Sequence, residues 1–281
     1  MPSPNITRKL RLAVGLQNLA DDELRLGKLD ATEGNLRRSI ALCREVKHAY
    51  WEAVGHAELG RLLAYKAAFS ESETQLDAAG RWLKEQGTPQ GECVLQSYRG
   101  LRSIIMGDAQ TASVVARRAL ELWDKTARER FPHERDRVRV EWLLGWALTG
   151  LAGERPGDAA RLLSEAGQHL TEALTRCRNI NMVDYEPDIL VAWARWHYAK
   201  GDAVRARQAA AEALYVTDRC EYRLVQADIH NFLARLAVDA GDKDAARKEA
   251  EIAKERAWCD GPPHCYKPAL DEAERLLKEI G

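Results

Sequence analysis

The chain has 281 residues, of which 46% are apolar and 30% are charged, and its 42 basic and 43 acidic side chains leave a formal net charge of −1. This composition favours a folded protein over a disordered chain. The even charge balance argues against nucleic-acid binding, because proteins that neutralise phosphates usually carry a basic excess. The longest uncharged run, residues 142–153, is too short for a transmembrane helix, which needs about 20 apolar residues.

The first residues, MPSPNITRKL, lack the apolar core of a signal peptide, so we expect a cytoplasmic protein. The six cysteines are mostly far apart in the sequence. A chain of this size does not need disulfide bonds to fold, so we expect reduced thiols.

A tight turn recurs along the chain at intervals of forty residues. The turn positions are Gly27, Ala67, Gly107, Gly201 and Gly241. Helix-forming residues flank each turn, so each one predicts two antiparallel helices. The longer interval between the third and fourth turns leaves room for one more pair with insertions, over residues 141–174. Those insertions leave the register of this fourth hairpin open.

Small residues recur at fixed distances from these turns. Seven positions before the turn, or at the equivalent place in the fourth hairpin, stand Ala20, Gly60, Gly100, Gly145, Ala194 and Ala234. After the turn at Gly201, alanines follow at 206, 210 and 213, on one helix face. Small side chains let two helices approach to about 8 Å. Glycine ends the first helix, and the aspartate after it can cap the second.

We therefore expect an all-α, right-handed superhelical solenoid that forms a single array over residues 1–281. Its hairpins are expected at residues 13–48, 53–87, 93–130, 138–178, 187–220 and 227–258, followed by a capping helix at 268–280. The nine prolines all fall outside the interiors of these helices, where a proline would cost about 3 kcal/mol. A polar last helix suits the open end of a stack.

These hairpins resemble tetratricopeptide repeats (TPR). The match is best over residues 188–214, where Leu190, Trp193, Ala194, Tyr198, Gly201, Ala206 and Ala213 fit the family pattern. It extends over residues 13–254, with a period of forty residues in place of thirty-four. The resemblance implies a non-catalytic module that binds a protein or peptide along a concave groove, which the first helices of the hairpins line.

A narrower resemblance concerns the C-terminal part. The runs NMVDYEPDILVAWARWHYAKGD, ADIHNFLARLAVDAGD and CDGPPHCYKPALDEAERLL are similar to the end of the sensor arrays of bacterial STAND NTPases, which are related to NLR immune receptors. In that family the repeats recognise a trigger and a separate nucleotide-binding domain switches. This chain has no GxxxxGK[ST] phosphate loop. The resemblance therefore implies a ligand-sensing array for signalling or antiphage defence, either part of a longer protein or a stand-alone homologue.

The TPR resemblance also implies which side chains face the groove. The candidate ligand-binding residues are Arg61, Tyr65, Trp142, Trp146, Arg195, Tyr198, Asn231 and Arg235. Further inward positions include Asp21, Leu24, Arg25, Leu101, Arg139, Asp188 and Asp228. Arginine grips carboxylates with its planar fork, and aromatic rings offer apolar area, so the set suits a peptide. Two alternatives stay open: the tryptophans pack between helices, and the arginines lie on a solvated face.

The loop at residues 258–267, WCDGPPHCYK, is a second candidate site. Its possible zinc ligands are Cys259, His264 and Cys265. Their spacing matches no common zinc pattern. We expect instead a turn fixed by the Gly-Pro-Pro sequence, with Trp258 and Tyr266 covering the end of the stack.

No catalytic motif stands out. The run FPHERD, residues 131–136, lacks the second histidine of HExxH, and neither GxSxG nor GxGxxG occurs. We expect no cofactor, metal, nucleic-acid partner or membrane. The rival interpretations are an RNA-binding helical array, a metal-dependent enzyme built on the C-terminal loop, and a scaffold or oligomerisation adaptor.

Overall fold

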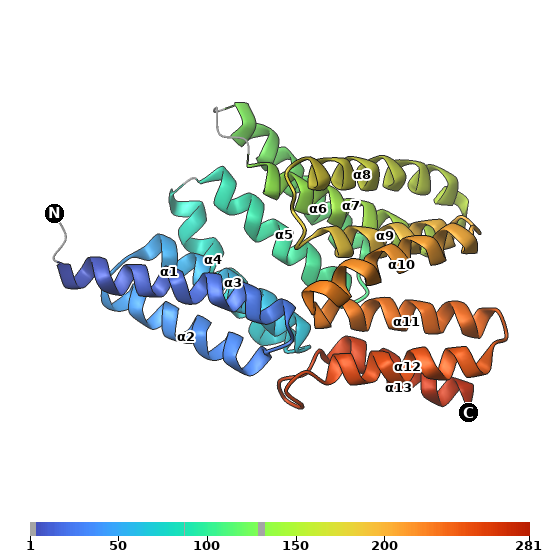
Figure 1. Cartoon of the computed structure of the whole chain (residues 1–281). Coiled ribbons are helices and arrows are strands. Elements are labelled where there is room, and N and C mark those ends of the chain that lie inside the picture. The colour runs from blue at the N-terminus through green and yellow to red at the C-terminus, as the bar shows by residue number, and fades with distance from the viewer. Residues whose placement is uncertain (1–3, 87, 129–132) are drawn as a thin grey trace.

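The computed structural model describes residues 4–86, 88–128 and 133–281, and within them it contains thirteen α-helices and no strand (Figure 1). The helices are α1 (Pro4–Arg25), α2 (Leu29–Glu45), α3 (Ala49–Tyr65), α4 (Phe69–Gln86), α5 (Pro89–Ile105), α6 (Ala109–Arg128), α7 (Glu134–Glu154), α8 (Ala159–Asn179), α9 (Glu186–Ala199), α10 (Ala203–Cys220), α11 (Arg223–Asp239), α12 (Lys243–Trp258) and α13 (Lys267–Ile280). The expected all-α solenoid of helical hairpins is confirmed.

Each odd-numbered helix up to α11 packs against the even-numbered helix that follows it, and α13 packs on α11 and α12. The first helix of each hairpin begins before its expected bound, most clearly α1, which begins at Pro4 rather than at residue 13. The expected ends of the second and third hairpins, residue 87 and residues 129–130, lie outside the described residues, as do residues 131–132 of the FPHERD run.

The five predicted turn residues share one backbone conformation. Their φ angles are 75° at Gly27, 57° at Ala67, 80° at Gly107, 79° at Gly201 and 75° at Gly241. After three of these turns, an aspartate side chain accepts a hydrogen bond from the backbone N–H three residues later, at 2.8 Å for Asp108 and 3.0 Å for Asp202 and Asp242. The forty-residue alignment therefore reflects a repeated helix–turn–helix geometry.

The small residues before the turns allow close contact between the helices of a hairpin. A Cβ atom added at Gly145 would lie 2.5 Å from Cγ of Leu170 and 3.2 Å from the carbonyl oxygen of Ala166. Gly60 has the same relation to the helix that follows it. The alanines on the facing helices are buried, as at Ala206, which is 0% exposed. Gly145 thus fixes the register of the fourth hairpin, and its insertion forms the 3-10 turn Pro156–Asp158 before α8.

We predict that Gly145→Ala lowers the free energy of unfolding by about 1–3 kcal/mol, because the added methyl group overpacks the contact between α7 and α8. Gly100→Ala is the matched control. It stands at the equivalent place on α5, where the nearest atom to an added Cβ is 3.8 Å away. There the better helix propensity of alanine should raise stability by about 0.5–1 kcal/mol. Urea denaturation of both variants checks this, and equal effects would contradict the packing argument.

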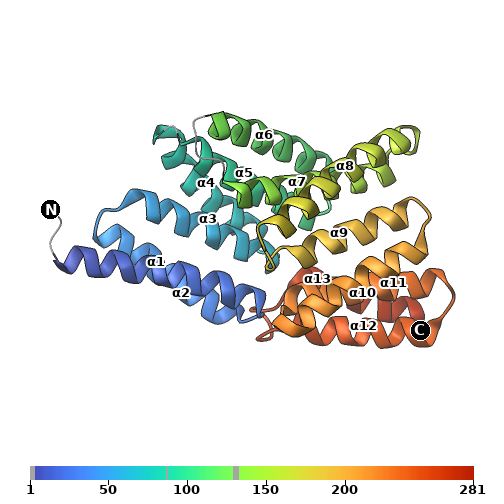
Figure 2. The same ribbon diagram turned by 45° about the horizontal axis from the view of Figure 1, so that its top comes forward.

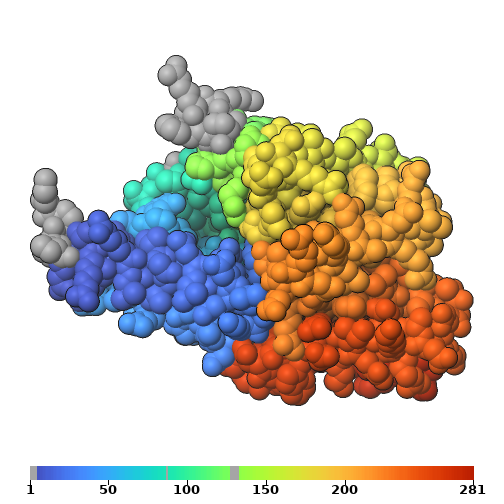
Figure 3. Space-filling view, viewed as in Figure 1, coloured from blue at the N-terminus to red at the C-terminus, as the bar shows by residue number. Residues whose placement is uncertain are grey.

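The solenoid closes on itself. Figures 1 and 2 show the N-terminal hairpin beside α11 and the loop that precedes α13, and Figure 3 shows the two surfaces in direct contact. The backbone N–H of Asp30 donates a hydrogen bond of 3.0 Å to Asp260. A Cβ atom at Gly27 would lie 3.0 Å from Cδ of Arg223 and 3.2 Å from Sγ of Cys259. The absence of a side chain at this turn therefore permits the closure.

The loop at residues 259–266 takes part in this closure rather than covering the end of the stack, which corrects the expectation from the sequence. Tyr266 is 4% exposed and its ring packs edge-on against Tyr65, with centroids 5.2 Å apart. Trp258 remains 48% exposed. The apolar face of α13 covers α11 and α12 instead.

Two further observations concern the described residues only. They contain no group of three or more His, Cys, Asp or Glu side chains placed to hold a metal ion. None of the described helices is long and apolar enough to cross a lipid bilayer.

Candidate binding site

The closed solenoid encloses a small cavity on its axis side. Its lining residues are Leu24, Arg25, Arg61, Tyr65, Leu101, Trp142, Tyr185, Asp188, Leu224 and Val225. They lie on α1, α3, α5, α7, α9 and α11, or directly before α9 in the case of Tyr185. The odd-numbered helices therefore form the inner wall, as the TPR resemblance implies. The cavity volume is about 30 Å³, enough for one or two water molecules.

Arg61 is held at the cavity by two carboxylates. Its Nη2 atom pairs with Asp21 on α1 and lies 2.7 Å from Glu58 on its own helix. The guanidinium also stands over the ring of Tyr98, 5.2 Å from its centroid. Burial alone would raise the pKa of Asp21, but Arg61 and Arg25 together hold that pKa well below its usual value. Arg61 is thus a positioned, permanently charged group of the inner wall.

Tyr185 lies between two arginines. The guanidinium carbon of Arg25 is 4.6 Å from the centroid of its ring, and that of Arg139 is 5.2 Å away. Nε of Arg139 donates a hydrogen bond of 2.9 Å to the Tyr185 hydroxyl. Arg25 also donates to the carbonyl oxygen of Asp184 and lies 3.3 Å from its carboxylate. These contacts connect α1 and α7 to the start of α9.

Trp142 both packs and lines the cavity. Its indole N–H donates a hydrogen bond of 3.1 Å to the carbonyl oxygen of Asp188, and its ring meets that of Tyr185 edge-on at 5.8 Å. Trp146 lies one turn later, and the centroids of the two tryptophan rings are 5.6 Å apart. The guanidinium carbon of Arg195 stands over the Trp146 ring, 4.9 Å from its centroid. Trp142 and Trp146 therefore pack against neighbouring side chains and also form part of the inner wall.

Two inner carboxylates have weak partners. The closest ion-pair contact of Asp188 among the described residues is Nη1 of Arg25, at 3.9 Å, and that of Asp228 is Nη2 of Arg195, also at 3.9 Å. The hydroxyl of Tyr266 donates to Asp228 at 3.2 Å. Burial raises the pKa of Asp188 to about 7 and that of Asp228 to about 6, against the smaller opposing effect of the arginines. Both groups titrate near neutral pH.

The structure brings five of the eight candidate residues together. Arg61, Tyr65 and Trp142 line the cavity. Trp146 lies beside Trp142, and Arg195 lies beside Asp228. Tyr65 also contacts the closing loop through Tyr266.

The other three candidates lie elsewhere. Asn231 is 5% exposed and donates a hydrogen bond of 2.8 Å to the carbonyl oxygen of Ala269. Arg235 forms a two-pronged pair with Glu279, at 2.9 and 3.0 Å. Tyr198 is 36% exposed and bonds to Asp239. For Asn231 and Arg235 the physical reason is that α13 packs on α11 and takes the polar groups that a ligand would have met, whereas Tyr198 bonds to the last residue of α11.

Tyr98 and Tyr185 join the site without having been expected from the sequence. Tyr185 lies in the linker before α9, so no helical periodicity places it. Tyr98 is buried at 3% exposure and reaches the wall through Glu58, to which its hydroxyl donates at 2.5 Å. Tyr98 lies on α5 between the positions expected to face the groove and those expected to pack against the next helix, so the sequence pattern did not identify it.

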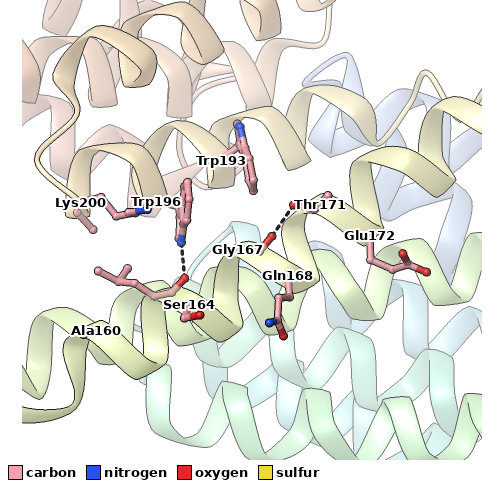
Figure 4. Close-up of a pocket in the computed structure, with 11 residues that line it drawn as sticks. Ala160, Ser164, Gly167, Gln168, Thr171, Glu172, Trp193, Trp196 and Lys200 are labelled. Carbon is pink, nitrogen blue, oxygen red and sulfur yellow. Dashed lines mark hydrogen bonds between the residues drawn. The ribbon is translucent and has the colours of Figure 1, made fainter.

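A second, wider cleft lies between α8 and α9, with a volume of about 890 Å³ (Figure 4). The rings of Trp193 and Trp196 stack at 4.7 Å, and the indole N–H of Trp196 donates a hydrogen bond of 2.7 Å to the carbonyl oxygen of Leu163. A Cβ atom at Gly167 would lie 2.7 Å from the Trp196 ring. Nζ of Lys200 stands 4.5 Å above that ring. These contacts fix the position of Trp196, whose ring separates α8 from α9.

Comparison with known proteins supports the fold. No protein-family model matches the chain, and no curated protein matches it. Among solved structures, the chain is similar to NprR in complex with its cognate peptide NprX, with a TM-score of 0.58 and 15% sequence identity over 100% of this chain and 79% of that one. At this identity the similarity concerns the fold alone. Together with the repeated hairpins, it shows a TPR-like fold.

The two raised carboxyl pKa values predict how stability depends on pH. The pKa of Asp188 is about 7 in the folded state against 3.8 as the ordinary value, so the folded state retains a proton that the unfolded chain loses. Stability contributed by this group is therefore lost as pH rises from about 4 to 7. We predict that Asp188→Asn raises the free energy of unfolding at pH 8 by up to about 4 kcal/mol, since the shift is about three pKa units and one unit corresponds to about 1.4 kcal/mol.

At pH 5 the same variant should differ little from the wild type. Asp244→Asn, at an exposed position on α12, is the control. Urea denaturation at both pH values measures the difference, and a variant that is less stable at pH 8 would contradict the assignment of a poorly compensated carboxylate.

Proposed function

We propose that the chain is a non-catalytic module that binds a protein or peptide on the inner wall of its odd-numbered helices. The observation that carries this proposal is the convergence of Arg25, Arg61, Tyr65, Trp142 and Asp188 from four helices on one cavity. Arginine and aromatic side chains in a desolvated setting are the residue types that dominate the binding energy of protein interfaces. The peptide bound by NprR, which has the same kind of fold, supports a peptide as the ligand.

The chemistry of the buried thiols supports a non-catalytic role. Burial raises the pKa of Cys93 and of Cys177 to about 12. A thiol of that pKa is almost entirely protonated at neutral pH and is a poor nucleophile. Burial also raises the pKa of Cys259, in the closing loop, to about 11. These cysteines are best explained by packing.

Ligand entry requires the closure to open. A cavity of about 30 Å³ cannot hold a peptide side chain of ordinary size. The closure includes the Asp30–Asp260 hydrogen bond and the Tyr65–Tyr266 ring contact. It also includes a cluster of buried apolar side chains, among them Leu24, Leu59 and Leu224, which opening would have to separate. Separating the first two hairpins from α11 and the loop would expose the inner wall while leaving each hairpin intact.

A finer assignment rests on sequence resemblance alone. We propose that the chain is the ligand-sensing array of a bacterial, cytoplasmic STAND-type signalling or defence protein. Its ligand would then be a trigger protein, and a separate nucleotide-binding domain would respond to it. A scaffold or oligomerisation adaptor is the second candidate function, since an inner wall of this kind also suits a permanent partner.

We predict that Arg195→Ala reduces ligand capture at least tenfold, because it removes the guanidinium that stands 4.9 Å from the centroid of the Trp146 ring and so frees an aromatic side chain of the inner wall. Arg38→Ala makes the same change at an exposed position on the outer helix α2 and should leave capture unchanged. Purified protein is mixed with a peptide extract, and bound peptides are identified by mass spectrometry. Circular dichroism verifies folding of both variants. Equal capture by both variants would contradict binding at the inner wall.

A further inference from the structure

The inner wall carries carboxylate charge that its own arginines leave poorly paired. Asp21 pairs closely with Arg61, and Asp184 lies 3.3 Å from Arg25. By contrast, the shortest ion-pair distance at Asp188 within the described residues is 3.9 Å, although this side chain is only 15% exposed. Asp228, which adds to the negative potential at Asp188, has no shorter contact of this kind in the same part of the chain. A cation at the cavity would be stabilised by both carboxylates.

The same cavity is also lined by arginines with hydrogen-bond donors that lack acceptors. The side chains of Arg25 and Arg61 are 10% and 7% exposed. In the described chain, the Nε atoms of both are buried and have no hydrogen-bond partner. A buried donor without an acceptor costs about 1–3 kcal/mol. Both side chains line the same cavity as Asp188, so a ligand bound there could bring an acceptor to the arginines and a cation to the carboxylate.

A small group of ligands can satisfy both demands. An α-amino group is a compact ammonium with three donors, and the carbonyl oxygen of the same residue is an acceptor only three bonds away from the nitrogen. A lysine side chain brings the cation without a neighbouring acceptor. A carboxylate brings the acceptor but repels Asp188 and Asp228. An ammonium group is about the size of the water molecule that the closed cavity could hold, and the rest of the ligand is accommodated when the closure opens.

We propose that the cavity between Asp188, Arg25 and Arg61 binds a free α-amino group together with its adjacent neutral carbonyl, the chemistry of a peptide amino terminus and of an amino-acid amide. The ammonium lies against Asp188, and the carbonyl oxygen accepts from Nε of Arg25 or Arg61. This inference rests on the proposed peptide-binding function and names the part of the ligand that is held. The approach of a cation would also lower the pKa of Asp188 from its value of about 7.

Four probes test the proposal on the full chain. They are a mixture of random hexapeptide amides with free amino termini, the same mixture N-acetylated, N-acetylated hexapeptide amides that contain one lysine, and leucinamide. Equilibrium dialysis at pH 8 followed by mass spectrometry gives the affinity of each. The free hexapeptides should bind at least tenfold more tightly than either acetylated set. Tight binding of leucinamide as well would support the same chemistry and show that a single residue with a neutral carbonyl is sufficient.

The variant Asp188→Asn keeps the shape of the side chain and removes its charge, so affinity for the free hexapeptides should fall at least tenfold. Asp244→Asn is the matched control and should bind like the wild type. Unfolding midpoints of both variants separate loss of binding from loss of folding. Equal binding of free and acetylated hexapeptides would overturn this inference and leave the proposed function intact. Binding of none of the probes would overturn both.

Discussion

The contact between the N-terminal hairpins and the C-terminal loop is the constraint on which the inner site depends. An open solenoid exposes the inner faces of its first helices to water. Here the turn after α1 meets α11 and the loop, because Gly27 places no side chain against Arg223 and Cys259. The inner faces of the odd-numbered helices are therefore withdrawn from solvent, and a surface that would be a broad groove becomes a small cavity.

Because the solenoid is closed, the charged side chains of the inner wall are buried and interact strongly with one another. Charges buried in a medium of low polarity must be paired or must shift their pKa values. The wall does both: Arg61 is paired with Asp21 and Glu58, whereas burial raises the pKa of Asp188 and Asp228. Tyr185 fills the space between Arg25 and Arg139 and accepts a hydrogen bond from the latter. Asp188 and Asp228 remain without a closely paired cation, which favours a ligand that supplies one.

Local patterns in the sequence were sufficient to predict the hairpins. The turn glycines and the small residues before them follow from backbone geometry within forty residues, so their spacing translates directly into structure. The inward direction of Arg61, Tyr65 and Trp142 is what the TPR resemblance implies. The closure of the solenoid cannot be predicted from these local features, because it depends on the small rotations between successive hairpins, added along the whole chain. For the same reason the sequence did not show that α13 would take Asn231 and Arg235, or that Tyr185 would enter the wall from a linker.

The closure is tested most directly by comparing Gly27→Ala with Gly241→Ala. Both turns have a φ angle of 75°, so the backbone strain of an alanine is the same. Nothing lies within 4 Å of a Cβ at Gly241, whereas a Cβ at Gly27 meets the closing contact. Hydrogen exchange should quicken in the loop at residues 259–266 and at the start of α9 in Gly27→Ala only. The same exchange pattern in both variants would contradict a closed solenoid held together at this turn.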